Sequence, residues 1–62
     1  MTKKDYVLIA ANIADVMDWA HDADTDAITA IEAVAERVAT ALKADNPRFD
    51  RARFLAACGV NN

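Results

Sequence analysis

Apolar residues recur every three or four positions along two long stretches of the chain, which is the pattern of amphipathic α-helices. In residues 3–20 one helical stripe collects Tyr6, Ile9, Ala10, Ile13, Val16, Met17 and Ala20. In residues 25–44 a second stripe contains Ile28, Ile31, Ala35, Val38 and Leu42, and it is broadened by Val34 and Ala41. We therefore expect two helices that bury these stripes against each other.

Capping signals indicate where these two helices begin and end. Thr2, followed three residues later by Asp5, resembles a capping box at the start of the first helix. Asp24 or Thr25 provides a start for the second helix. This helix should end before Pro47, because a residue that precedes proline avoids helical backbone angles.

A short third helix is expected over residues 51–57. Asp50 is a suitable N-cap, and Phe49 and Phe54 have the spacing of a hydrophobic staple. Gly59 suits the left-handed position that closes a helix. Together the three segments predict an all-α mini-domain, in which a short C-terminal helix packs across an antiparallel two-helix hairpin.

The C-terminal segment carries a distinctive motif. Residues 46–59 read NPRFDRARFLAACG, and Lys4, Asp5 and Tyr6 stand together near the start. With these residues the chain resembles a group of very short proteins encoded by bacteriophages and prophages, often from actinobacterial hosts, that share an NPxFDRxRFLxACG-like ending. The resemblance implies a phage origin and a place in the cytoplasm of the infected bacterium, but no particular activity.

The same motif brings three arginines close together in the sequence, namely Arg48, Arg51 and Arg53. In one interpretation the motif is purely structural, with a proline stop, an aromatic staple and a closing glycine. In the other, the arginines form a basic patch that binds an acidic partner. Both interpretations stay open from the sequence.

The size of the chain favours self-association. With 62 residues and 6.7 kDa, residues 1–62 are expected to form a single small domain. Hydrophobic residues make up 55% of the chain, but fifteen of them are alanine, which buries little area. A chain this short buries only about 60% of its unfolded surface. We therefore expect a homodimeric helical bundle, in which Ile28, Val34 or Trp19 packs against its copy.

Two large apolar residues, Leu8 and Trp19, fall outside the apolar stripe of the first helix, and Asp15 lies beside them on the helical wheel. One explanation is that the helix over residues 51–57 folds across them. The other is that Leu8, Asp15 and Trp19 form an exposed partner-binding patch for a second copy or a host protein, since tryptophan is enriched among interface hot spots.

Charge is unevenly distributed along the chain. Residues 5–36 contain eight acidic residues and no Lys or Arg, whereas residues 37–62 contain five basic and two acidic ones. The net charge of −3 argues against nucleic acid as the main partner, because phosphate binding needs a basic surface. A further alternative is that Asp15, Asp18 and Asp22 imitate the phosphates of a nucleic acid.

Catalytic, metal-binding and cofactor-binding patterns are not expected. The chain has no serine, a single His21 and a single Cys58, which is expected to be a packing residue in a reducing cytoplasm. Residues 22–26 match the opening of a calcium loop, but Ala27 and Ala33 replace its glycine and its glutamate. These acids are better explained by the helix dipole.

The sequence therefore predicts a small, acidic phage protein that is not an enzyme and acts by protein–protein interaction, with a host factor as one partner. The alternatives are a self-assembling structural or accessory protein and an acidic nucleic-acid mimic. Neither a signal-peptide pattern nor an apolar stretch long enough to span a membrane is apparent, so we expect a cytoplasmic location.

Overall fold

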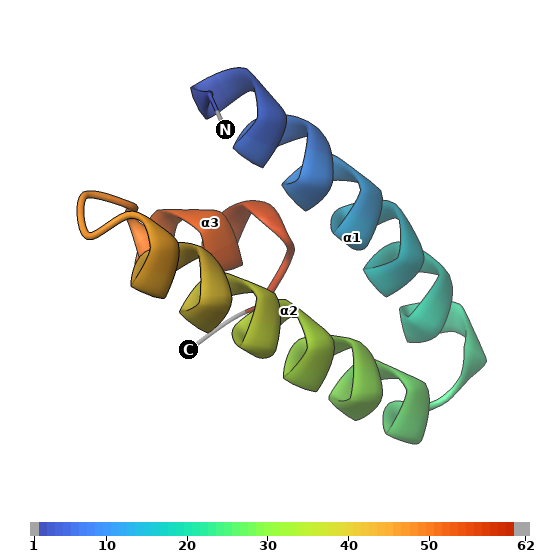
Figure 1. Cartoon of the computed structure of the whole chain (residues 1–62). Helices are drawn as coiled ribbons and strands as arrows, with labels where there is room; N and C mark the ends of the chain where they lie inside the picture. Colours follow the sequence, from blue (N-terminus) through green and yellow to red (C-terminus); the bar gives the residue numbers. More distant parts are fainter. Residues whose placement is uncertain (1, 61–62) are drawn as a thin grey trace.

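The computed structural model describes residues 2–60, which form three α-helices (Figure 1). The helices are α1 (Lys3–Ala23), α2 (Thr25–Asp45) and α3 (Arg51–Ala57). The two long helices form an antiparallel hairpin, and α3 packs against both of them near the N-terminal end of α1. The predicted all-α class, with two long helices and a short third one, is confirmed.

A single residue, Asp24, separates α1 from α2. Its extended backbone ends α1, and its Oδ1 accepts a hydrogen bond from the Ala27 N–H at 2.8 Å, which caps α2. Helix α1 therefore reaches Ala23, three residues beyond the predicted end at Ala20. The prediction placed this end too early because the cap, and not the last apolar residue of the stripe, decides where the helix stops.

The other helix ends follow the predicted capping residues. Asp5 Oδ2 accepts hydrogen bonds from the Thr2 N–H at 3.0 Å and from the Thr2 hydroxyl at 3.3 Å. Helix α2 ends at Asp45, one residue later than predicted and still before Pro47. The Lys43 ammonium reaches over the connection that follows and donates hydrogen bonds to the carbonyls of Pro47 and Phe49, at 2.6 and 3.1 Å.

Helix α3 is only seven residues long, so its stability depends on its caps and on packing. Asp50 Oδ1 accepts a hydrogen bond from the Arg53 N–H at 3.0 Å. At the other end, Gly59 has a φ of +88°. The N–H groups of Gly59 and Val60 donate to the carbonyls of Ala56 and Leu55, at 3.1 and 3.0 Å. These bonds form a Schellman motif, which confirms the predicted closure by glycine.

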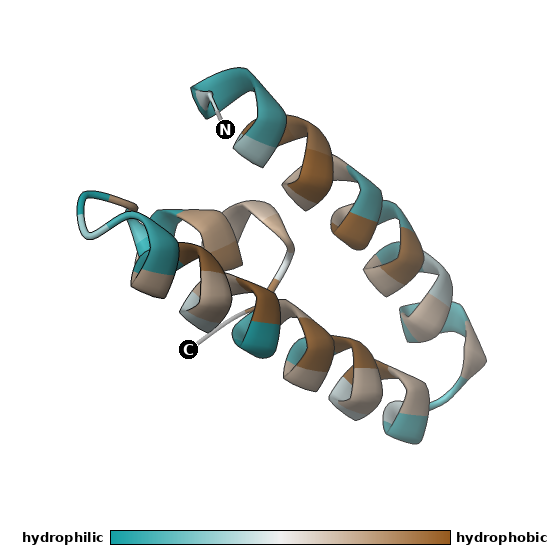
Figure 2. Ribbon diagram, viewed as in Figure 1, coloured by the Kyte–Doolittle hydropathy of each residue, from teal (hydrophilic) through white to brown (hydrophobic). Residues whose placement is uncertain are grey.

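The core combines small residues from the hairpin with large ones from the C-terminal segment. Four alanines of α1 and α2 are buried; they are Ala10, Ala20, Ala35 and Ala39. Phe49, Phe54, Leu55, Cys58 and Val60 supply most of the remaining buried hydrophobic residues. In Figure 2 the hydrophobic segments of α1 and α2 face each other, whereas the α1–α2 connection and most of the α2–α3 connection are hydrophilic.

An aromatic cluster fixes the position of α3 on the hairpin. The Phe49 ring lies 5.4 Å from the Phe54 ring, as expected for the hydrophobic staple. It also packs edge-on against Tyr6 of α1, with ring centroids 4.8 Å apart. Edge-to-face contacts of this kind stabilise beyond the area that they bury. The staple therefore joins the start of α3 to the start of α1.

Two valines that the apolar pattern assigned to the core are exposed. Val16 is 48% exposed and Val34 is 56% exposed, and Ala41 is exposed beside them on α2. The assignment was wrong because α3 covers only one side of the hairpin. The apolar stripes of α1 and α2 are wider than the part of each helix that another helix of this chain covers.

Candidate functional site

The exposed valines belong to a continuous apolar surface, which we call the open face and define by Leu8, Asn12, Val16, Trp19, Ile31 and Val34. Leu8 and Trp19 are each 63% exposed. At 3.6 residues per turn, Leu8, Asn12, Val16 and Trp19 lie within an arc of about 80° on α1. Trp19 points about 180° away from Ala10, which α3 covers. The open face is therefore the side of the hairpin away from α3.

The alternative in which the third helix covers Leu8 and Trp19 is wrong. The Phe49 and Phe54 rings pack on the side of α1 that carries Tyr6. The staple and the Asp50 cap orient α3 toward that side, so no large residue of the C-terminal segment is left to shield Trp19. The structure thus places Leu8, Asp15 and Trp19, the predicted partner-binding residues, in solvent-exposed positions on α1.

The centre of the open face is a shallow groove of about 370 Å³ between the two long helices. It is lined by Asn12, Ile13, Val16, Ile31 and Val34. The one polar side chain among these is Asn12, whose Nδ2 donates a hydrogen bond to the Leu8 carbonyl at 2.9 Å. This bond satisfies one N–H of the amide when the groove is covered, whereas the second N–H and Oδ1 need partners from whatever covers it.

Charged side chains border the open face on both helices. On α1, Asp15 lies next to Leu8 around the helix, and on α2, Arg37 lies on the side of Val34. Both charged residues are exposed. The two edges of the same apolar surface therefore carry opposite charges, which favours a partner with the same arrangement.

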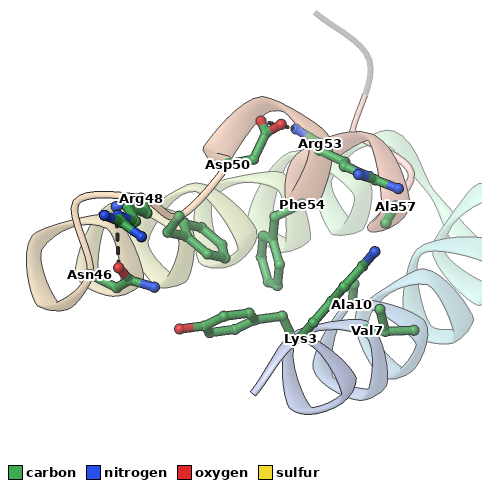
Figure 3. Close-up of a pocket in the computed structure, with 11 residues that line it drawn as sticks. Lys3, Val7, Ala10, Asn46, Arg48, Asp50, Arg53, Phe54 and Ala57 are labelled. Atoms are coloured by element: carbon green, nitrogen blue, oxygen red, sulfur yellow. Dashed lines mark hydrogen bonds between the residues drawn. The ribbon is translucent and has the colours of Figure 1, made fainter. Parts of the chain in front are cut away.

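A second surface feature lies on the other side of α1, where α3 meets the start of the chain. It is a cavity of about 460 Å³, which we call the basic pocket, and Figure 3 shows the residues that line it. Arg48 and Arg53 line the pocket together with Lys3. Arg51 is not among the lining residues, so the predicted patch of three arginines is divided in the structure.

The helical period explains this division. Arg51 and Arg53 are two positions apart on α3, so their directions around the helix differ by about 160°. Lys3 replaces Arg51 in the pocket because the aromatic cluster brings the start of α1 beside α3. Sequence reasoning missed Lys3, since nothing in its local sequence links it to residues almost fifty positions away.

The acidic residues around the α1–α2 turn are exposed and point into solvent rather than toward a shared centre. The group comprises Asp18, Asp22, Asp24 and Asp26. Asp24 acts as the cap of α2, as the helix-dipole interpretation expects. Within residues 2–60 there is no group of three or more His, Cys, Asp or Glu side chains that could hold a metal ion.

Cys58 is completely buried in the core. Burial raises the pKa of its thiol above the ordinary value, because the thiolate would lose its hydration. The thiol therefore stays protonated at neutral pH and is a poor nucleophile. Its position agrees with the prediction of a packing residue near the end of a helix.

Among the described residues, no helix is long and apolar enough to cross a membrane. The comparisons with known proteins add no further constraint on function. No protein-family model matches the chain, and neither the curated proteins nor the solved structures contain a significant match.

Proposed function

We propose that this protein is a phage-encoded, non-enzymatic interaction protein that works as a homodimer formed through the open face. The observation that carries the proposal is the group of large apolar side chains exposed on one continuous surface, Leu8, Val16, Trp19 and Val34. Leaving such a surface in water is unfavourable, and rimmed apolar patches of this kind are typical of interfaces.

A second copy fits this surface for two reasons. Two hairpins that pack face to face form a four-helix bundle, in which the four exposed apolar side chains of each copy become core residues. If the two-fold axis runs parallel to the helices, α1 of one copy lies against α2 of the other. The edge that carries Asp15 then meets the edge that carries Arg37 of the second copy, so opposite charges adjoin.

A host protein is the alternative occupant of the same surface. The C-terminal motif supports a phage origin, and a phage protein acts in the cytoplasm of its bacterial host. The single, buried Cys58 is compatible with that reducing compartment. Self-association and host binding through the open face are competing uses, because both would cover Trp19.

The test is the mass of the protein in solution, measured by light scattering across a dilution series. We expect about twice 6.7 kDa for the natural sequence. Val34→Glu should yield a monomer, because it would place a charge in the centre of the bundle core. Val7→Glu is the matched control, since Val7 is an equally exposed valine outside the open face. It should remain dimeric.

A monomer at every concentration of the natural protein would refute the homodimer and leave the open face free for a host protein. Dissociation by Val7→Glu but not by Val34→Glu would assign the interface to another surface. A nucleic-acid mimic would depend instead on Asp15, Asp18 and Asp22, and its binding would weaken steeply with salt.

A further inference from the structure

The basic pocket combines positive charge at its ends with an aromatic floor. In Figure 3 the Lys3 side chain extends from α1 toward α3, where the Arg53 side chain reaches over the same end of the pocket. Arg48 lies at the other end beside Asn46, whose Oδ1 accepts a hydrogen bond from the Arg48 N–H at 3.2 Å. Cationic groups therefore stand at both ends of one cavity.

The local charge of the pocket is positive although the chain is acidic. Three cationic side chains and one carboxylate, that of Asp50, line it, which gives a net charge of +2. The Asp50 carboxylate caps α3 by accepting a hydrogen bond from the backbone N–H of Arg53. The acidic α1–α2 turn lies at the far end of a molecule 34 Å long, several times the Debye length of about 8 Å at physiological salt. Its charges are therefore screened from the pocket.

The middle of the pocket is apolar. Tyr6, Phe49 and Phe54 form its aromatic part, and the exposed side chains of Val7 and Ala57 line it next to them. Val7 is 59% exposed and does not belong to the open face, so the pocket contains a large exposed hydrophobic residue of its own. The volume of about 460 Å³ lies within the range of about 300–1,000 Å³ that is usual for ligand sites.

We propose that the basic pocket binds an acidic peptide segment of another protein. A bulky apolar side chain of the peptide packs on the aromatic part, and carboxylates on either side of it pair with Arg48 at one end and with Lys3 and Arg53 at the other. Arginine presents a planar fork of N–H donors that matches a carboxylate. The proposal does not depend on the open face, because the two surfaces lie on different sides of α1.

The arrangement of charges favours a peptide over other anions. A small carboxylate would use the cations at one end only, whereas a peptide spans the apolar middle and reaches both ends. A nucleic acid presents a continuous run of phosphates but would meet only three cations, all within this one pocket. Alternating acidic and apolar groups are therefore the chemistry that the pocket complements best.

The experiment is a nuclear magnetic resonance titration of the isotope-labelled protein with the blocked peptide acetyl-Asp-Glu-Phe-Glu-Asp-amide. We expect the amide signals of Val7, Arg53 and Ala57 to shift and that of Val34 to stay in place. Removing one cation, by Lys3→Ala, Arg48→Ala or Arg53→Ala, should raise the dissociation constant by about fivefold, because exposed ion pairs contribute modestly. A double Lys3→Ala, Arg53→Ala variant should lose more than tenfold.

Arg51→Ala is the matched control, since it removes one arginine of the same helix that does not line the pocket. It should bind the peptide as the natural protein does, and Lys4→Ala on α1 serves as a second control if the first variant fails to fold, since Lys4 is exposed and does not line the pocket. The variant peptide acetyl-Asp-Glu-Ala-Glu-Asp-amide should bind more weakly, because it has no side chain for the aromatic part of the pocket. Circular dichroism would confirm that each variant retains its helices.

Four results of the binding experiments would overturn the proposal. The first is that no amide signal shifts at millimolar peptide, and the second is that Arg51→Ala and Arg53→Ala lose the same amount of peptide affinity. The third is that the two peptides bind equally well, and the fourth is that a single-stranded DNA oligonucleotide binds more tightly than the acidic peptide. A change in the solution mass of Arg53→Ala would also overturn it, because the acidic turn of a second copy would then be the occupant.

Discussion

On the side of the hairpin that α3 covers, Ala10 and Met17 are at most 3% exposed, whereas on the open face Leu8 and Trp19 of the same helix lie mostly in water. Both sides of α1 carry apolar residues. What differs is whether a neighbouring segment reaches them, and the staple of Phe49 and Phe54 directs the only short helix of residues 2–60 to one side. Burial in this protein is therefore a property of position and not of residue type.

The strongest test of this comparison is a matched pair of leucines. Leu55→Ala in the covered core should lower the free energy of unfolding by about 3 kcal/mol, because it removes a fully buried side chain and leaves a cavity. Leu8→Ala on the open face should cost less than about 0.5 kcal/mol in the monomer. Denaturant unfolding at low protein concentration measures both. Equal losses would mean that Leu8 is buried in the monomer.

Trp19→Ala tests the use of the open face. The monomer should keep its stability, but the free energy of dimer dissociation should fall by about 2 kcal/mol, because a tryptophan at an interface core is a typical hot spot. Sedimentation equilibrium would measure the change, with Val7→Ala as a control of similar exposure. An unchanged dissociation constant for Trp19→Ala would place Trp19 outside the interface.

Gly59→Ala tests how α3 is held on the covered side. The φ of +88° is strained for any residue with a Cβ, so the variant should lose about 1–2 kcal/mol of stability. The loss would come from the backbone and not from a clash, because the nearest atom to a new Cβ, Met17 Cγ, is 3.5 Å away. Thermal unfolding measures the loss, and an unchanged melting temperature would show that the Schellman motif is dispensable.

The smallest expected effect concerns Cys58. Its pKa is raised above the ordinary value of 9.0, so the unfolded chain loses the thiol proton first as the pH rises. Well below the ordinary pKa the thiol therefore has no effect on how the free energy of unfolding changes with pH. Above that pKa the free energy should decline, until the pH reaches the raised pKa of the folded thiol. In Cys58→Ala the free energy of unfolding, measured with denaturant, should decline less between about pH 8 and about pH 10 than in the natural protein. Identical slopes would contradict this account.

Local signals in the sequence were sufficient for the number of helices and for their capping residues, although the end of α1 was predicted three residues too early. Asp24, Asp50, Pro47 and Gly59 act within four residues of their own position, through hydrogen bonds or backbone angles. Such interactions are readable without knowledge of the fold, because the partners are close neighbours in the chain. The aromatic staple was readable for the same reason.

The candidate sites depended on contacts between distant residues. The position of α3 brings Lys3 and Arg53 into the same pocket and leaves Arg51 outside it. It also leaves Val16 and Val34 exposed. Periodicity identifies an apolar stripe but gives no information about how wide a part of it a neighbour covers.

The amino-acid sequence was therefore enough to establish an all-α chain of three capped helices with surplus apolar residues on the first one. Only the tertiary structure decided which side of the hairpin is covered and which charges share a pocket. The physical reason is that helix formation and capping are short-range, whereas the choice of side depends on the packing of Phe49 against Tyr6, more than forty residues apart. That contact creates the basic pocket and leaves the open face exposed.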